Sequence, residues 1–177
     1  LKPFSNRKII LYVPTFRDDR ETEYFNFPHL DVVKLHQKLK ELNACILIKA
    51  HINEGDKQAN KFLDDDFVRT VTNDDLPYFQ EFLSQVDLIL TDYSGIYFDY
   101  LLVNKPMMFL PYDIDLYEKE RGFIFDYHEN TPGKKVPTFQ QFLEGIEIYL
   151  NNPKEDEEER LKIQEKFHKY TDGKASQ

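Results

Sequence analysis

The stretch TDYSGIYFDY, residues 91–100, decides the fold and points to a site. It follows the apolar run 86–90, which predicts a buried strand, and it leads into the apolar stretch 96–103, which predicts a buried helix. A strand that ends at Thr-Asp and turns through Ser-Gly into a helix directs free backbone N–H groups toward one point. The helix dipole makes that point attractive to anions, phosphate above all. The simpler interpretation is an ordinary Asp or Ser N-cap on a core helix.

Strand and helix signals alternate along the rest of the chain. Short apolar runs predict buried strands, and apolar residues at helical spacing predict helices between them. The expected strands are residues 8–13, 44–49, 67–71, 88–91 and 106–110. The expected helices are 30–42, one opening at Asp74 and Asp75, 96–103, 138–150, and a last one that begins after Asn152-Pro153 and runs to about residue 170. This β-α-β order predicts an α/β fold with a mainly parallel sheet and helices on both faces.

Composition bounds the kind of protein. The 177 residues are 41% hydrophobic and 15% aromatic, so we expect a globular single domain over residues 1–177. A formal net charge of −9 argues against non-specific nucleic-acid binding, which needs a basic surface. The single cysteine, Cys45, lies in an apolar run, so we expect a buried thiol and neither a disulfide nor a zinc site. No apolar run approaches the ~20 residues that span a bilayer, and no signal peptide is visible.

Polar residues follow four of the five expected strands. They are residues 15–18, which include Arg17, then Lys49 with His51, then residues 91–95, then Tyr112 with Asp113. Ligands of open parallel sheets bind outside the carboxyl ends of the strands. Guanidinium and ammonium groups pair with phosphate, and imidazole can move a proton or stabilise charge near neutral pH. Taken singly, Arg17 could belong to a solvated turn and His51 could cap a loop. Their coincidence on one sheet edge predicts a phosphate-binding site.

Six short motifs occur in the order in which one protein family carries them. They are ILYVPTFRD (10–18), IKAH (48–51), LTDYSGIYFD (90–99), NKPMMFLPYD (104–113), RGFIFDY (121–127) with the Pro-Gly of 132–133, and DGKAS (172–176). Over nearly its whole length the chain thereby resembles the CDP-glycerol glycerophosphotransferase family. Members of that family prime and polymerise poly(polyol phosphate) chains such as wall teichoic acids.

The resemblance implies an architecture and an activity. It implies a GT-B enzyme, in which the nucleotide lies between two Rossmann-like domains, with this chain as the C-terminal, donor-binding half. The implied reaction moves glycerol phosphate or ribitol phosphate from a CDP-activated donor to a hydroxyl of a polyol-phosphate or lipid-linked acceptor, and releases CMP. No metal or cofactor is implied, because helix N–H groups and basic side chains can neutralise the phosphates. The full-length protein is expected in the cytoplasm, peripheral on the inner face of the bacterial plasma membrane.

The resemblance also assigns roles to residues. It implies that His51 and Arg121 belong to the reaction centre and that Thr91, Ser94 and Gly95 lie near the donor pyrophosphate. The rest of the expected site consists of phosphate contacts from Arg17 and Lys49 and supporting carboxylates at Asp92, Asp99 and Asp113. The chain departs from the family pattern at two of these positions. Many members have Ser at the position of Gly95. Many have Arg at the position of Lys49, and a lysine there would weaken the bidentate contact that arginine makes with phosphate.

One expected part of the enzyme has no counterpart in this sequence. The family's second catalytic histidine lies in a Trp-His-Gly-Thr-Pro segment of the N-terminal half, and this chain has no tryptophan and no such segment. The chain also begins without Met and ends abruptly, so we expect an excised domain that binds donor but does not turn over alone. Two other classes stay open: a GT-B nucleotide-sugar glycosyltransferase domain, and a non-catalytic nucleotide-binding module.

Overall fold

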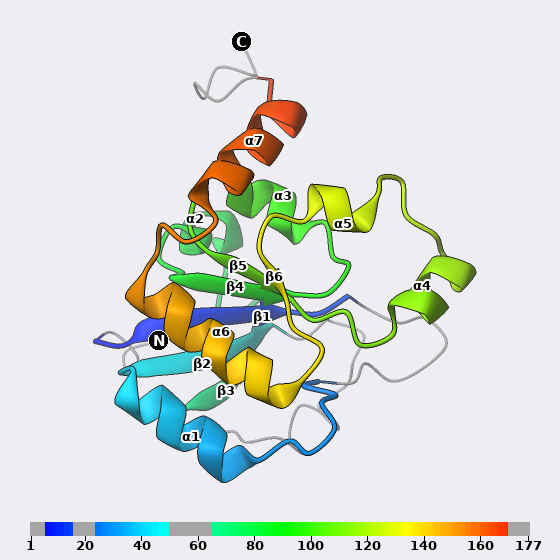
Figure 1. The fold of residues 1–177 in the computed structure, drawn as a ribbon. Helices are drawn as coiled ribbons and strands as arrows, with labels where there is room; N and C mark the ends of the chain where they lie inside the picture. Colours follow the sequence, from blue (N-terminus) through cyan, green and yellow to red (C-terminus); the bar gives the residue numbers. More distant parts are fainter. Residues whose placement is uncertain (1–5, 16–23, 50–64, 170–177) are drawn as a thin grey trace.

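The computed structural model describes residues 6–15, 24–49 and 65–169. They form a six-stranded sheet in the order β3-β2-β1-β4-β5-β6, in which every neighbouring pair is parallel (Figure 1). The strands are β1 (Lys8–Val13), β2 (Ala44–Lys49), β3 (Val68–Val71), β4 (Leu88–Thr91), β5 (Met107–Phe109) and β6 (Lys134–Lys135). The helices are α1 (Val32–Glu41), α2 (Phe79–Leu83), α3 (Ile96–Leu101), α4 (Ile114–Glu120), α5 (Tyr127–Asn130), α6 (Phe139–Asn151) and α7 (Glu157–Phe167). This is the strand order of a Rossmann fold, so the predicted Rossmann-like α/β class is confirmed.

The sheet separates two hydrophobic layers, because successive side chains of a strand point to opposite faces. Ile10 and Tyr12 pack into the layer formed with α1 and α6. Leu11 packs into the other layer, which α2, α3, α5 and α7 complete. Figure 1 shows α1 and α6 on one side of the sheet and α2, α3 and α7 on the other. Cys45 is completely buried in the second layer, as expected.

The carboxyl ends of the strands meet at one edge of the sheet, because the strands are parallel. In the register of the sheet, Val13 lies beside Thr91, Thr91 beside Phe109, and Lys49 beside Val71. The loops that follow β1, β2, β4 and β5 therefore leave from this edge. The sequence had placed its polar clusters on these same loops.

Helices α1 and α6 begin within two residues of the expected starts, whereas two other helices begin at least three residues late. The helix expected at Asp74 and Asp75 begins at Phe79, because the Asp75 carboxylate accepts from the N–H and the hydroxyl of Thr72, 2.9 Å each, and closes a turn there.

The expected start of the last helix after Asn152-Pro153 is also wrong. Helix α7 begins at Glu157, behind Asp156 in a left-handed conformation (φ 56°). The buried guanidinium of Arg160 donates to the carbonyls of Pro153 and Glu155 and holds this segment as a turn.

The segment between β5 and α6 holds three elements that the sequence did not predict: α4, α5 and the two-residue strand β6. β6 follows Gly133, whose φ of +142° suits glycine alone, and a Cβ there would lie 2.2 Å from the carbonyl oxygen of Met107. The longest helix, α6, has 13 residues. Within the described ranges, no helix is long and apolar enough to cross a membrane.

Candidate functional site

The turn between β4 and α3 is open to solvent at the carboxyl edge of the sheet. Gly95 is exposed and is the N-cap of α3, and a Cβ added to it would meet nothing within 4 Å. The Ser94 hydroxyl accepts weakly from the N–H of Ile96, at 3.4 Å. Helix α3 has only six residues, fewer than expected, so anion attraction here would come from its first N–H groups and little from a helix dipole. Asp99 lies exposed further along the same helix.

Two buried polar side chains brace this edge. One carboxylate oxygen of Asp92, a residue only 3% exposed, accepts from the N–H and hydroxyl of Thr15, at 2.7 and 2.5 Å, and from the N–H of Tyr93, at 2.6 Å. The Thr91 hydroxyl donates to the carbonyl of Val13, at 2.7 Å, and the residue is fully buried. These bonds join the ends of β1 and β4. Thr91 therefore braces the edge, and its expected place near the donor pyrophosphate stays a prediction.

The basic residues expected after β1 and β2 are only partly described. Lys49 ends β2, and its ammonium donates to the Asn73 side-chain oxygen, at 2.7 Å, and lies 5.0 Å from the centre of the Phe79 ring. Partial burial lowers the pKa of Lys49. Arg17 and His51 lie outside the described residues, so their roles stay predictions.

Helix α4 brings Arg121 to the same edge. Asp113 is its N-cap, and the Asp113 backbone N–H donates to the Tyr93 hydroxyl, at 3.3 Å. The ring of Tyr93 stacks on Tyr117 of α4, with centroids 4.2 Å apart. Arg121 is the exposed C-cap, and Gly122 after it takes φ +70° while donating to the carbonyl of Tyr117, at 3.2 Å. The helix end therefore reverses the chain directly after Arg121.

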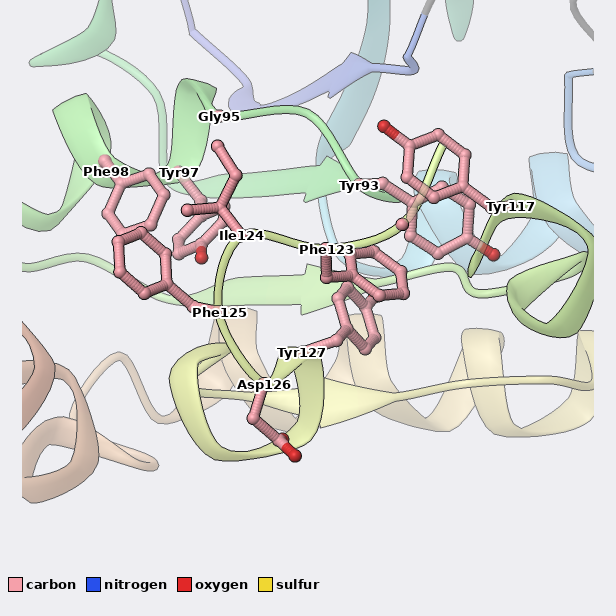
Figure 2. A pocket seen from close by; sticks show the side chains of 11 residues that line it. Tyr93, Gly95, Tyr97, Phe98, Tyr117, Phe123, Ile124, Phe125, Asp126 and Tyr127 are labelled. Atoms are coloured by element: carbon pink, nitrogen blue, oxygen red, sulfur yellow. The ribbon is translucent and has the colours of Figure 1, made fainter. Parts of the chain in front are cut away.

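An aromatic pocket of about 260 Å³ lies beside this turn (Figure 2). Its lining is Tyr93, Gly95, Tyr97, Phe98, Tyr117, Gly122, Phe123, Ile124, Phe125, Asp126 and Tyr127. The rings of Phe123 and Tyr127 stack at 5.2 Å, and the Tyr127 hydroxyl donates to the backbone carbonyl of Asp92, at 3.0 Å. Sequence reasoning missed this pocket. The signal was the alternation of aromatic residues at 123, 125 and 127.

The chemistry of this edge suits an anion next to a flat or apolar group. Backbone N–H groups at Ser94 and Gly95 and the exposed guanidinium of Arg121 are donors that can pair with an anion, and the aromatic pocket offers apolar surface beside Gly95. In the part of the chain that the structure describes, no three His, Cys, Asp or Glu side chains gather to hold a metal ion.

Comparison with known proteins identifies relatives in teichoic acid synthesis. The family model for CDP-Glycerol:Poly(glycerophosphate) glycerophosphotransferase matches residues 4–177. The teichoic acid ribitol-phosphate polymerase TarL of Staphylococcus aureus is 30% identical over 97% of this chain and 30% of its own length. The teichoic acid glycerol-phosphate primase of Bacillus subtilis is 30% identical over 97% of this chain and 42% of its own length. The chain therefore spans less than half of these relatives.

Solved structures agree with the sequence comparison. The structure of the wall teichoic acid polymerase TagF matches 91% of this chain and 38% of its own length, with a TM-score of 0.68 and 27% identity. A Staphylococcus aureus MnaA–UDP structure, 19% identical with a TM-score of 0.57, shares the fold. The resemblance found in the sequence is thus confirmed, and the chain belongs to the CDP-glycerol:poly(glycerophosphate) glycerophosphotransferase family.

Proposed function

We propose that this chain is the donor-binding half of an enzyme that transfers a polyol phosphate from a CDP-activated donor to an acceptor hydroxyl. The observation that carries the proposal is the family match over residues 4–177. TarL is named a ribitol-phosphate polymerase and the Bacillus subtilis relative a glycerol-phosphate primase. Glycerol phosphate and ribitol phosphate are therefore both candidates for the transferred group, on a polyol-phosphate or lipid-linked acceptor.

The reaction exchanges one P–O bond for another. The acceptor hydroxyl oxygen bonds to the phosphorus that carries the polyol, the bond from that phosphorus to the bridging oxygen breaks, and CMP leaves with the electron pair. The hydroxyl proton passes to a base. We assign the base to a histidine of the other half of the enzyme and a phosphate-stabilising role to His51. Lys49, two residues away in sequence, would disfavour protonation of that imidazole, and a neutral imidazole can still donate one hydrogen bond.

Groups at the sheet edge can neutralise the negative charge of the donor. In this proposal the pyrophosphate oxygens accept hydrogen bonds from the N–H groups of Ser94 and Gly95 and pair with the guanidinium of Arg121. Lys49 and Arg17 are further cations for the same phosphates. The exposure of Gly95 and Arg121 supports this placement, because a ligand can reach both without displacing core side chains. Charge-assisted hydrogen bonds contribute roughly 1.5–3 kcal/mol each. Catalysis would need the other half of the enzyme, at the inner face of the plasma membrane.

Calorimetry with three nucleotides tests the proposal. The 177-residue chain should bind CDP-glycerol or CDP-ribitol and should bind UDP-N-acetylglucosamine at least ~10-fold more weakly, a difference of about 1.4 kcal/mol. Preference for the UDP-sugar would indicate a glycosyltransferase domain instead. If no nucleotide binds, the donor-binding assignment is wrong and the non-catalytic class is favoured.

A further inference from the structure

The candidate site is made by two segments that are separate in sequence. The β4–α3 turn carries Gly95, and Arg121 belongs to residues 117–123, here named the Arg121 segment. Gly95 and Gly122 line the same pocket, so the turn and the residue next to Arg121 face one cavity. Helix α4, which leads into Arg121, has no buried residue, and a segment with few buried contacts opens at a low cost in free energy. Contacts of its flanking side chains therefore have to hold the Arg121 segment against the turn.

A cluster of four aromatic rings joins the Arg121 segment to the turn. The members of this ring cluster are Tyr93, Tyr117, Phe123 and Tyr127 (Figure 2). Tyr93 of the turn stacks on Tyr117, with ring centroids 4.2 Å apart. The centroid of Phe123 lies 5.6 Å from that of Tyr93 and 5.2 Å from that of Tyr127. Tyr117 precedes Arg121 and Phe123 follows it, so the ring cluster holds the segment on both sides of the guanidinium.

Tyr127 adds a polar bond from the ring cluster to the backbone of the turn. Its side chain is buried, and its hydroxyl donates to the carbonyl oxygen of Asp92, at 3.0 Å. Burial holds the pKa of Tyr127 well above its usual value, so the hydroxyl stays protonated at neutral pH. The Asp92 carboxylate accepts from Thr15 at the end of β1. Asp92 is therefore tied to the sheet by its side chain and to Tyr127 by its carbonyl.

We propose that Tyr127 is a positioning residue, which fixes the Arg121 segment relative to the turn through its hydroxyl and its ring. The inference rests on the proposed function, in which the turn and Arg121 contact the same pyrophosphate. One ligand makes both contacts together only when the two segments keep a set separation. A displacement of about 1 Å is enough to break a charge-assisted hydrogen bond. Tyr127 thus acts on the donor through Arg121.

Calorimetry with CDP-glycerol on the 177-residue chain tests this role by comparing Tyr127→Phe with Tyr100→Phe. Tyr100 is a matched control, because its buried hydroxyl donates to the Val86 carbonyl, at 2.9 Å, at the other end of α3 from Gly95. Each substitution keeps the ring and removes one bond from a buried hydroxyl to a carbonyl, so both should lower Tm by about 3 °C. Tyr127→Phe should weaken CDP-glycerol about fivefold, and Tyr100→Phe less than about twofold.

A double-mutant cycle with Arg121→Ala separates positioning from general loosening of the fold. Once the guanidinium is absent, misplacement of its segment costs no contact with the donor. Tyr127→Phe should therefore weaken CDP-glycerol less than about twofold in the Arg121→Ala background, against about fivefold in the unmodified chain. If Tyr127→Phe fails to fold, Phe123→Leu takes its place, because it loosens the ring cluster and keeps the hydroxyl bond. The same coupling to Arg121 is expected for it.

The outcomes distinguish this inference from the proposed function. If the unmodified chain binds CDP-glycerol and the two tyrosine variants change its affinity equally, Tyr127 is only structural and donor binding stands. If the effects of Tyr127→Phe and Arg121→Ala multiply, Tyr127 does not act through Arg121, and the positioning role is wrong. If the unmodified chain binds no CDP-glycerol, the proposed function fails, and the positioning role fails with it.

Discussion

Replacing Asp92 by Ala should destabilise the protein and the site together. The substitution removes one acceptor oxygen that serves three donors, two on Thr15 and one on Tyr93. A hydrogen bond to a charged group contributes roughly 1.5–3 kcal/mol, and bonds that share one acceptor do not add fully. We therefore expect a loss of about 3 kcal/mol in the free energy of unfolding. That is a large part of the ~5–15 kcal/mol of a typical domain.

Urea unfolding followed by far-UV circular dichroism measures this loss. Asp99→Ala is the control, because it removes an exposed carboxylate from the neighbouring helix, and it should stay within ~0.5 kcal/mol of the unmodified chain. Since the Asp92 carboxylate fixes the first N–H of the turn that carries Gly95, Asp92→Ala should also weaken CDP-glycerol binding. A stability loss below about 1 kcal/mol at unchanged denaturant slope would refute the bracing role.

Substitutions at four further positions test the phosphate turn, the cation, the histidine and the edge strand. Gly95→Asp, which meets no neighbouring atoms within 4 Å, should lower CDP-ligand affinity at least ~10-fold in calorimetry and leave the fold intact; unchanged affinity contradicts a phosphate turn. Arg121→Ala should weaken the donor about tenfold without shifting thermal unfolding, and a variant that unfolds yet binds normally would make Arg121 structural. In the full-length enzyme, His51→Asn should retain more activity than His51→Ala; equal inactivity and a pH–rate profile without its basic limb would make His51 the general base. Gly133→Ala should destabilise by more than ~3 kcal/mol in urea unfolding, because its Cβ would overlap the Met107 carbonyl; a stable variant would show that β6 can shift.

The strands were the most predictable part of the fold. The bounds of β1, β2 and β4 agree with the expected 8–13, 44–49 and 88–91. These strands are buried on both faces of a parallel sheet, so each one is a continuous apolar run with sharp ends. Helix α6 was also predictable: it spans Phe139–Asn151, where the sequence predicts 138–150. Phe142, Ile146 and Tyr149 form one buried stripe at helical spacing, and this stripe is visible in the sequence.

Helix starts were less predictable, because the side chains that fix them act through tertiary contacts or local turns. Asp75 looks like an N-cap in sequence but hydrogen-bonds back to Thr72. Asn152-Pro153 looks like a helix start, but the carbonyl of Pro153 accepts from Arg160, seven residues later. Polar side chains close to a helix compete to form hydrogen bonds with the same backbone groups. Which side chain forms the bond depends on contacts that the local sequence does not contain.

The sequence predicted which residues lie at the carboxyl edge of the sheet. It did not predict which of them are buried and which are exposed to solvent. The rule that ligands lie beyond the carboxyl ends of parallel strands placed Thr91, Ser94 and Gly95 together. Whether Thr91 reaches solvent depends on the register of β1 against β4, which sets its hydroxyl against the Val13 carbonyl. Contacts across 78 residues of sequence, such as this one, leave no local signal.

The edge thus has an inner and an outer set of polar groups. The inner set, Thr91 and Asp92, is buried, and its hydrogen bonds are made to the chain itself. The outer set, Gly95 and Arg121, is exposed to solvent. These inner bonds hold the ends of β1 and β4 together in the structure without ligand. If donor binds at the outer set, as proposed, binding would therefore not have to supply the free energy of ordering the turn. Changes to the inner set should therefore appear first in stability, and changes to the outer set in affinity alone.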